Sequence, residues 1–127
     1  MTAVLLDTHA WAWSLTGADR LTARAIAAID GAERVMVSPI SFFEIAQKVR
    51  LGKWPQMEPL IDTLPAILEE QGGTIADLDE AICVAAGMMI WPHRDPFDRL
   101  LAATALRRAT PLISADTVFD GLVPRIW

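Results

Sequence analysis

Short apolar runs that alternate with helical segments most strongly limit the folds open to this chain. Three of these runs contain no polar residue: Val4–Leu6, Val35–Val37 and Leu112–Ile113. Consecutive residues of a strand face opposite sides of a sheet, so an unbroken apolar run indicates a strand that is covered on both faces. Strands that alternate with helices form parallel sheets between helical layers. The sequence therefore predicts an α/β fold with three layers, α/β/α, around a mostly parallel sheet of about four or five strands.

Capping residues, glycines and prolines mark the boundaries of the expected elements. Ser38 and Pro39 pair an N-cap with a proline in the first helical turn, and Asp77 with Glu80 resembles a capping box. Pro124 cannot donate a ladder hydrogen bond, which favours an edge position for the last strand. We expect strands at 3–7, 34–38, 74–76, 111–114 and 122–126. We expect helices at 8–15, 21–29, 38–51, 59–71, 77–86 and 97–108.

Composition narrows the class of protein. With 127 residues, of which 53% are hydrophobic, the chain is long and apolar enough for one folded domain, which we expect to cover 1–127. The longest charge-free tract, Ala81–Pro92, is too short to span a bilayer, which takes about 20 residues. Asp7 and His9 interrupt the first apolar stretch, which argues against a signal peptide. The single Cys83 cannot form an internal disulfide, and we expect it to be a small core residue of a cytoplasmic protein.

Four acidic residues stand where a predicted strand ends or a predicted helix begins: Asp7, Glu44, Asp98 and Asp116. Carboxylates at the ends of parallel strands gather at one edge of the sheet, which is the usual ligand site of open α/β folds. Oxygen donors of this kind suit hard cations such as Mg²⁺ or Mn²⁺. Several carboxylates in one place repel one another unless a cation shares the site. The four acids therefore indicate a metal-dependent enzyme that acts on phosphates.

Each acid also has a structural interpretation. Asp7 and Asp116 could cap the segments that follow them, and Asp98 lies in a first helical turn, where carboxylates favour the helix dipole. Asp95 precedes a proline, which is typical of an N-cap, and we assign it to capping. Glu44 lies in the second turn of its expected helix between two apolar residues, where an unpaired carboxylate is costly. We therefore favour a functional role for Glu44.

Four segments of the chain resemble the PIN domain: Val4–His9, Ser38–Ile45, His93–Ala102 and Leu112–Asp116. More specifically, the chain is similar to VapC-type toxins of bacterial toxin–antitoxin pairs. The likeness extends over nearly the whole chain, and the stretch from Asp95 to Leu101 is its most specific part. The resemblance implies a Mg²⁺- or Mn²⁺-dependent ribonuclease, in which metal-activated water attacks the phosphodiester and leaves a 5′-phosphate.

The same resemblance implies roles for individual residues and partners. Asp7, Glu44, Asp98 and Asp116 match the acidic quartet of the family and would hold one or two ions as the catalytic site. Asp120 matches only loosely. The resemblance also implies RNA as substrate, a homodimer, and a cognate antitoxin protein that blocks the site.

Basic and aromatic side chains near the acids are candidate contacts. The net charge of −5 means that any phosphate binding needs metal ions and a local basic patch. Trp11 and Trp13 are two positions apart on a presumed helix and point to nearly opposite sides, so we expect one of them to contact a partner protein. Lys48 also has i,i+4 spacing to Glu44, which suits an ordinary helix ion pair. The candidate RNA contacts are Lys48, Arg50, Arg94 and Arg99.

Two other functions compete with this interpretation. A metal-independent ribonuclease would use His9 and His93, the only histidines, as an acid–base pair. A catalytically silent PIN-like domain would only bind a partner. Loss of activity on chelation separates metal-dependent cleavage from the histidine mechanism.

Overall fold

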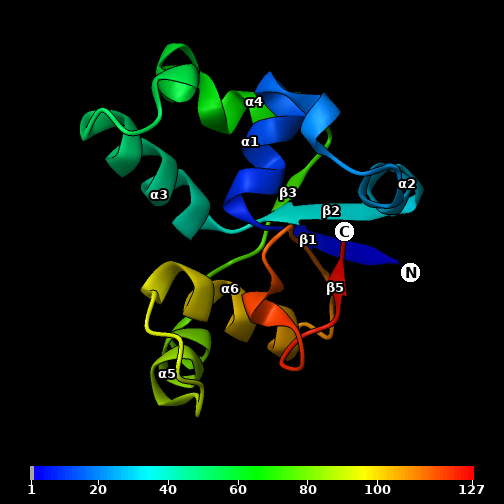
Figure 1. Ribbon diagram of the computed structural model, residues 1–127, viewed down its shortest axis with the longest axis vertical. Helices are drawn as coiled ribbons and strands as arrows, with labels where there is room; N and C mark the ends of the chain where they lie inside the picture. The colour runs from blue at the N-terminus through cyan, green and yellow to red at the C-terminus, as the bar shows by residue number, and fades with distance from the viewer. Residues whose placement is uncertain (1) are drawn as a thin grey trace.

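Five short strands run parallel in one sheet at the centre of the molecule (Figure 1). The structure is a computed structural model and describes residues 2–127. The strands lie in the order β3-β2-β1-β4-β5, so the chain builds outward from β1 in one direction and then in the other. Their bounds are β1 Ala3–Leu6, β2 Arg34–Val37, β3 Thr74–Ile75, β4 Leu112–Ile113 and β5 Arg125–Ile126. The fold class and the edge position of the last strand are as the sequence predicts.

Within the described residues 2–127, six α-helices and three 3₁₀ segments connect the strands. The α-helices are α1 Thr8–Thr16, α2 Ala23–Gly31, α3 Pro39–Arg50, α4 Leu64–Glu70, α5 Glu80–Met88 and α6 Pro96–Arg107. The 3₁₀ segments are η1 Ala18–Arg20, η2 Pro55–Thr63 and η3 Thr117–Phe119. The helix expected over 59–71 is thus a 3₁₀ segment followed by the shorter α4, with Pro59 and Pro65 interrupting its hydrogen bonding. Helix α5 is capped by Asp79, not by Asp77, because the Asp79 side chain accepts the Ile82 N–H.

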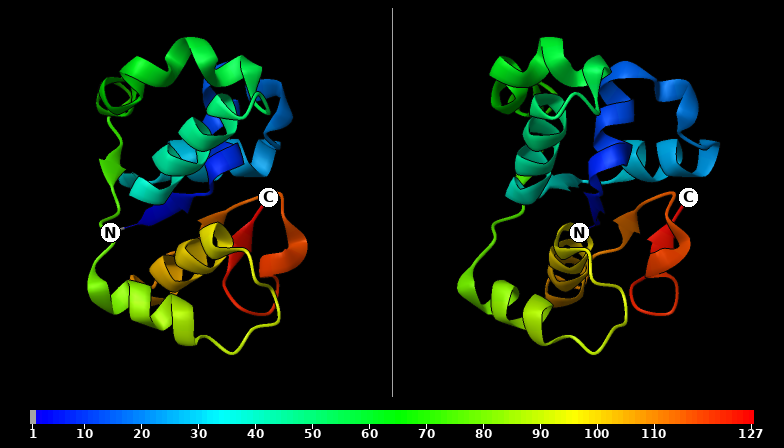
Figure 2. Two further views of the ribbon diagram at one scale, coloured as in Figure 1. Left: turned by 90° about the vertical axis from the view of Figure 1, so that its left-hand side faces the viewer. Right: turned by 60° about the vertical axis from the view of Figure 1, so that its left-hand side comes forward.

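Alternate residues of the central strands build two separate cores. Val4 and Leu6 pack beneath α1 to α4, together with the buried Trp11 of α1. Leu5 and Met36 face the other side and pack against α6. Figure 2 shows the two helical layers, with α1 to α4 on one side of the sheet and α5 and α6 on the other. Both faces of the sheet are covered, which explains the unbroken apolar runs of the strands.

The strand register brings three chain segments to one edge of the sheet. Leu6 of β1 lies opposite Val37 of β2 and Ile113 of β4. The residues that follow these strands therefore emerge side by side, and the Asp7 N–H donates to the Ile113 carbonyl at 3.0 Å. Because the strand order reverses between β1 and β4, this edge is the topological switch point at which open α/β sheets bind ligands.

The prediction of a buried Cys83 is wrong, because the side chain is exposed. Helix α5 directs Ile82 and Ala86, which are four positions apart, against Ala103 of α6. The residue next to Ile82 consequently points to solvent. Across residues 2–127, no helix has both the length and the apolar character needed to cross a membrane.

Candidate metal centre

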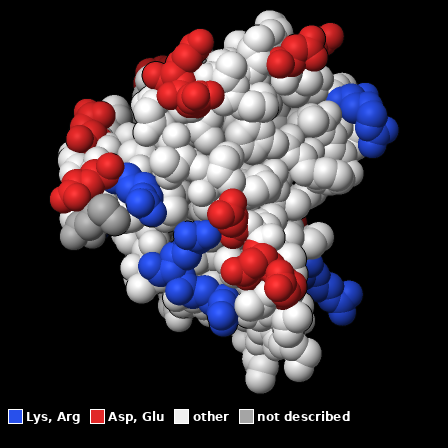
Figure 3. Space-filling model, turned by 180° about the vertical axis from the view of Figure 1, so that it is seen from behind, with Lys and Arg blue, Asp and Glu red and all other residues white. Residues whose placement is uncertain are grey.

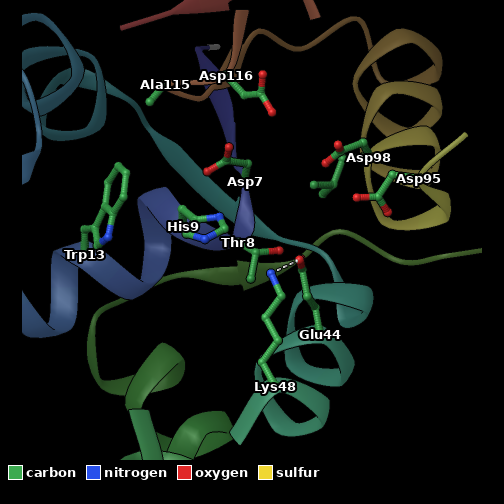
Figure 4. A pocket seen from close by; sticks show the side chains of 11 residues that line it. Asp7, Thr8, His9, Trp13, Glu44, Lys48, Asp95, Asp98, Ala115 and Asp116 are labelled. Atoms are coloured by element: carbon green, nitrogen blue, oxygen red, sulfur yellow. Dashed lines mark hydrogen bonds and ion pairs between the residues drawn. The ribbon is translucent and has the colours of Figure 1, made fainter. Parts of the chain in front are cut away.

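All four predicted acids line one cavity of about 370 Å³ at the carboxyl ends of β1 and β4. We call it the acidic cavity; its walls come from the sheet edge, α1, α3 and α6. Figure 4 shows Asp7 near its middle, with Asp95 and Asp98 on the α6 side and His9 and Trp13 on the α1 side. The structure thus brings together acids that are up to 109 positions apart in the sequence, from 7 to 116.

Asp7 is both a helix cap and a member of the cavity wall. Its Oδ1 accepts the Ala10 N–H at 2.7 Å at the start of α1, and its side chain is only 8% exposed. Burial, together with the charges of Asp98 and Glu44, raises the pKa of Asp7 to about 6, against the opposing effect of the Ser114 side chain and the Ala10 N–H. Asp7 is therefore a carboxylate whose charged form lacks sufficient compensation from the protein alone.

Glu44 points into the cavity from the second turn of α3. The cap of this helix is Ser38, whose Oγ accepts the Ile40 N–H at 3.1 Å, so Glu44 has no capping role, as the sequence predicts. Glu44 is 7% exposed, and its Oε2 accepts a hydrogen bond from Lys48 Nζ at 2.7 Å. One charge of the site is therefore already balanced by a lysine of the same helix.

Asp98 enters the cavity from the first turn of α6. Asp95 caps this helix through Oδ1 and the Phe97 N–H at 2.9 Å, as predicted, yet its side chain also lines the cavity. The Asp98 Oδ2 lies 2.6 Å from His93 Nε2. Burial, with a contribution from Asp95, raises the pKa of Asp98, while the His93 contact acts in the opposite direction. A histidine thus fixes the orientation of the Asp98 carboxylate.

Asp116 follows β4 and is the exposed member of the quartet. Its Oδ1 accepts the Val118 N–H at 3.0 Å, and its own N–H donates to Ser114 Oγ at 3.0 Å. Asp120 does not line the acidic cavity and instead forms an ion pair with Arg125, with an Nε–Oδ1 distance of 2.7 Å. This pairing assigns Asp120 to the fold and gives no support to a role in the site.

The donor set fits a hard divalent cation. Four carboxylates that face one cavity supply the oxygen ligands that Mg²⁺ and Mn²⁺ prefer. The raised pKa of Asp7 marks a site where a cation would relieve both burial and repulsion. The quartet is more widely spaced than a closed ligand shell, and within residues 2–127 the one tight group is His93, Asp95 and Asp98, with ligand atoms within 4.8 Å of one another.

The four basic residues that are predicted to contact RNA have different surroundings in the structure. Lys48 lines the acidic cavity, whereas Arg50 and Arg94 do not line it and stay predictions. Arg99 is committed to the fold, because its guanidinium donates to four backbone carbonyls: that of Ala86 in α5, and those of Met89, Trp91 and His93 between α5 and α6. These bonds use four of the five N–H donors of Arg99 and hold the segment that carries His93, so the structure gives no support to the prediction that Arg99 contacts RNA.

The two tryptophans of α1 have different environments. Trp11 is 1% exposed, and its Nε1 donates to Gln71 Oε1 at 3.0 Å, so it offers no surface to a partner, and the predicted partner contact stays a prediction for Trp13 alone. Trp13 is half-buried and lines the acidic cavity. Sequence reasoning missed Trp54, whose ring stacks on His9 with a centroid distance of 4.8 Å. A lysine and a tryptophan next to each other at the end of a helix, Lys53 and Trp54, were the available signal.

Comparisons with known proteins agree with this fold. The PIN domain family matches residues 4–122. Ribonuclease VapC22 of Mycobacterium tuberculosis is 31% identical over 116 residues, which cover 91% of this chain and 88% of the relative. The chain is also similar to solved structures of a toxin–antitoxin complex from Klebsiella pneumoniae (TM-score 0.64, 16% identity, 98% and 96% of the two chains) and of FitAcB from Neisseria gonorrhoeae (TM-score 0.63, 23% identity, 96% and 95%). At these identities the structural likeness concerns the fold.

Proposed function

This chain belongs to the PIN domain family, and we propose that it is a Mg²⁺- or Mn²⁺-dependent endoribonuclease and the toxin of a toxin–antitoxin pair. The observation that carries the proposal is the convergence of Asp7, Glu44, Asp98 and Asp116 on one cavity at the switch point of the sheet. The likeness to a relative named as a ribonuclease supports RNA as the substrate. We expect the protein to act in the cytoplasm, because that is where a toxin of this kind would meet cellular RNA.

In this proposal the protein holds the reacting groups in fixed positions. The four acids of the quartet would bind one or two ions, and bound Mg²⁺ or Mn²⁺ supplies activation of water and neutralisation of charge at the scissile phosphate. The bond between Thr8 Oγ1 and Ser41 Oγ, at 2.9 Å, ties α1 to α3 and so fixes Asp7 relative to Glu44. His93 fixes Asp98 in the same way from the other wall. Rigid placement of ligands is what a metal-dependent hydrolase requires.

The test is cleavage of a panel of transfer and ribosomal RNAs by the purified protein with Mn²⁺, with Mg²⁺ and with EDTA. We expect cleavage with either metal, none in EDTA, and products that carry a 5′-phosphate. The Asp98→Asn variant, which keeps the size of the side chain and loses its charge, is the control for a contaminating nuclease. Full cleavage in EDTA would instead support the histidine mechanism.

The structure gives no support to that histidine mechanism. His93 Nε2 faces the Asp98 carboxylate, and His9 stacks on Trp54 and makes a tilted contact with Trp13. Within residues 2–127, no hydrogen bond or ring contact joins the two histidines. An acid–base pair that acts on one phosphodiester needs both groups within reach of the same bond.

We also propose a homodimer and a cognate antitoxin as protein partners. The monomer exposes several large apolar side chains on α3, on α5 and just after it: Phe43, Val84, Met88 and Ile90. Exposed apolar surface of this kind marks protein–protein contacts. Light scattering of the purified chain tests the dimer, and a monomer at high concentration would contradict it. Retention of a co-expressed antitoxin during purification tests the second partner.

A further inference from the structure

A second hollow adjoins the acidic cavity on its α1 and α3 side. It measures about 410 Å³, which lies within the usual size of ligand sites. His9, Trp13 and Lys48 line both spaces, so the two lie on either side of the same three side chains. The remaining walls come from η1, from the segment after α3 and from the start of η2. We call this space the basic–aromatic hollow; its residues are His9, Trp13, Arg20, Lys48, Lys53, Trp54 and Gln56.

Aromatic rings supply the floor of the hollow. Trp54 and His9 stack with a centroid distance of 4.8 Å and an interplanar angle of 29°. Trp13 continues the group, with centroids 5.6 Å from His9 and 5.8 Å from Trp127. Both Trp13 and Trp54 are only half-buried, so part of each ring stays open to solvent. Open rings held in place by neighbouring rings are suitable platforms for stacking a nucleic-acid base.

Positive side chains surround these rings. Lys48 Nζ lies 5.5 Å from the centroid of Trp54, and Arg20 Cζ lies 5.8 Å from that of Trp13. Lys53 is exposed next to Trp54. In the part of the chain that the structure describes, neither Arg20 nor Lys53 is paired with a carboxylate. Their charges are therefore available to a ligand that carries phosphates.

The contrast between the two adjoining spaces favours a polynucleotide over a protein segment. The acidic cavity repels phosphate in the absence of metal ions, and the protein as a whole carries a net charge of −5. On the face turned away from the viewer of Figure 1, basic side chains lie beside acidic ones, and a broad uncharged area adjoins them (Figure 3). A substrate chain that enters the acidic cavity consequently needs a local region of positive charge beside it.

We propose that the basic–aromatic hollow is a subsite for single-stranded RNA, in which Trp54 and Trp13 stack bases and Arg20 and Lys53 contact phosphates adjacent to the bond that is cleaved. The inference rests on the proposed ribonuclease function and adds where the RNA next to the cleaved bond is held. Only unpaired bases present both faces for stacking, so the hollow selects single-stranded segments such as loops and excludes the interior of a duplex.

Binding of fluorescein-labelled decauridylate tests the subsite. We would measure anisotropy titrations in Mg²⁺ with Asp98→Asn as the parent, so that binding is followed without cleavage. Trp54→Ala should raise the dissociation constant about tenfold or more, and Trp54→Phe should restore part of the affinity. Lys53→Ala should weaken binding and reduce the slope of log affinity against log salt by about 0.7, whereas Trp54→Ala should leave that slope unchanged. A labelled diuridylate, too short to reach from the acidic cavity into the hollow, should respond less.

Arg107→Ala is the matched control, because Arg107 is an exposed arginine at the far end of α6 and outside both spaces. The subsite would be overturned if Trp54→Ala and Lys53→Ala both had the dissociation constant and the salt slope of the parent. It would also be overturned if Arg107→Ala weakened binding as much as these two variants, or if the parent bound no RNA. Unchanged RNA affinity would leave the hollow to an acidic protein segment. If the hollow variants weaken binding but the wild type cleaves no RNA, the subsite stands and the ribonuclease function falls. If the wild type cleaves RNA but the hollow variants bind RNA as the parent does, the ribonuclease function stands and the subsite falls.

Discussion

Replacement of Asp7 by asparagine should stabilise the metal-free protein at neutral pH. The substitution removes a buried negative charge but keeps an oxygen that can accept the Ala10 N–H, so the cap of α1 is retained. Asp7→Ala removes the charge and the cap together. The two variants therefore separate the electrostatic cost of the carboxylate from its contribution as a helix cap.

The size of the effect follows from the pKa of Asp7, which rises from 3.8 to about 6 on folding. Each pKa unit corresponds to about 1.4 kcal/mol, so the charged form costs the folded state about 3 kcal/mol above pH 6. Between about pH 4 and pH 6, the Asp7 carboxyl group is mostly protonated in the folded state and mostly ionised in the unfolded chain. Wild-type stability therefore falls as the pH rises from about 4 to 6, and Asp7→Asn should lose this dependence.

Urea unfolding in EDTA at pH 4.5 and pH 7.5 measures the difference. At pH 7.5 we expect Asp7→Asn to exceed the wild type by about 1–3 kcal/mol, and at pH 4.5 the difference should shrink to about 1 kcal/mol or less. Asp116→Asn is the matched control, because Asp116 also caps a helix but is exposed, and its effect should be smaller. Addition of Mg²⁺ should stabilise the wild type more than Asp7→Asn. An Asp7→Asn variant no more stable than the wild type at pH 7.5 would refute the argument.

Three further outcomes test other parts of the site. EDTA should abolish RNA cleavage, and Mg²⁺ or Mn²⁺ should restore it. Asp98→Asn should remove most activity, yet its unfolding midpoint in EDTA should stay at or above that of the wild type. The reason is that burial raises the pKa of Asp98, so the charged carboxylate destabilises the metal-free protein. Lys48→Met should destabilise the EDTA-treated protein by about 1–2 kcal/mol, because it leaves the Glu44 carboxylate unpaired. Calorimetry should show tighter Mg²⁺ binding to this variant, because the lysine no longer competes for Glu44. An unchanged stability and an unchanged Mg²⁺ affinity would contradict the ion pair. Met88→Glu should shift light-scattering mass towards the monomer, whereas the same change at the exposed Ala115 should not.

The sequence predicted the architecture well because the main signals are local. Unbroken apolar runs identified the buried strands, and Ser38 with Pro39 located the start of α3. The boundaries of the segment at 55–70 were wrong because its two internal prolines permit 3₁₀ geometry, which apolar periodicity does not distinguish from an α-helix. Cys83 was misplaced because α5 carries no polar side chain after Glu80 except that of Cys83 itself, so that composition alone does not show which side packs on α6.

The surroundings of the acids were less accessible to prediction than the acids themselves. Arg99 looks from its sequence position like a basic residue beside Asp98, and only the path of the segment before α6 shows that backbone carbonyls occupy its donors. Trp54 lies 45 positions from His9, and its stacking depends on how the segment after α3 returns towards α1. Contacts of this kind depend on tertiary structure, which residue spacing in the chain does not encode.

Capping and metal binding, which compete as explanations at the level of sequence, are compatible in the structure. Asp7 and Asp116 each use Oδ1 to accept a backbone N–H at the start of a helical segment. The second oxygen of each carboxylate is then held in a fixed direction by a bond that the helix needs in any case. A cap at the end of a parallel strand therefore orients a ligand without additional side chains. The same bonds explain why a fold whose charged Asp7 is costly can retain it: the cap stabilises α1 even before a cation balances the charge.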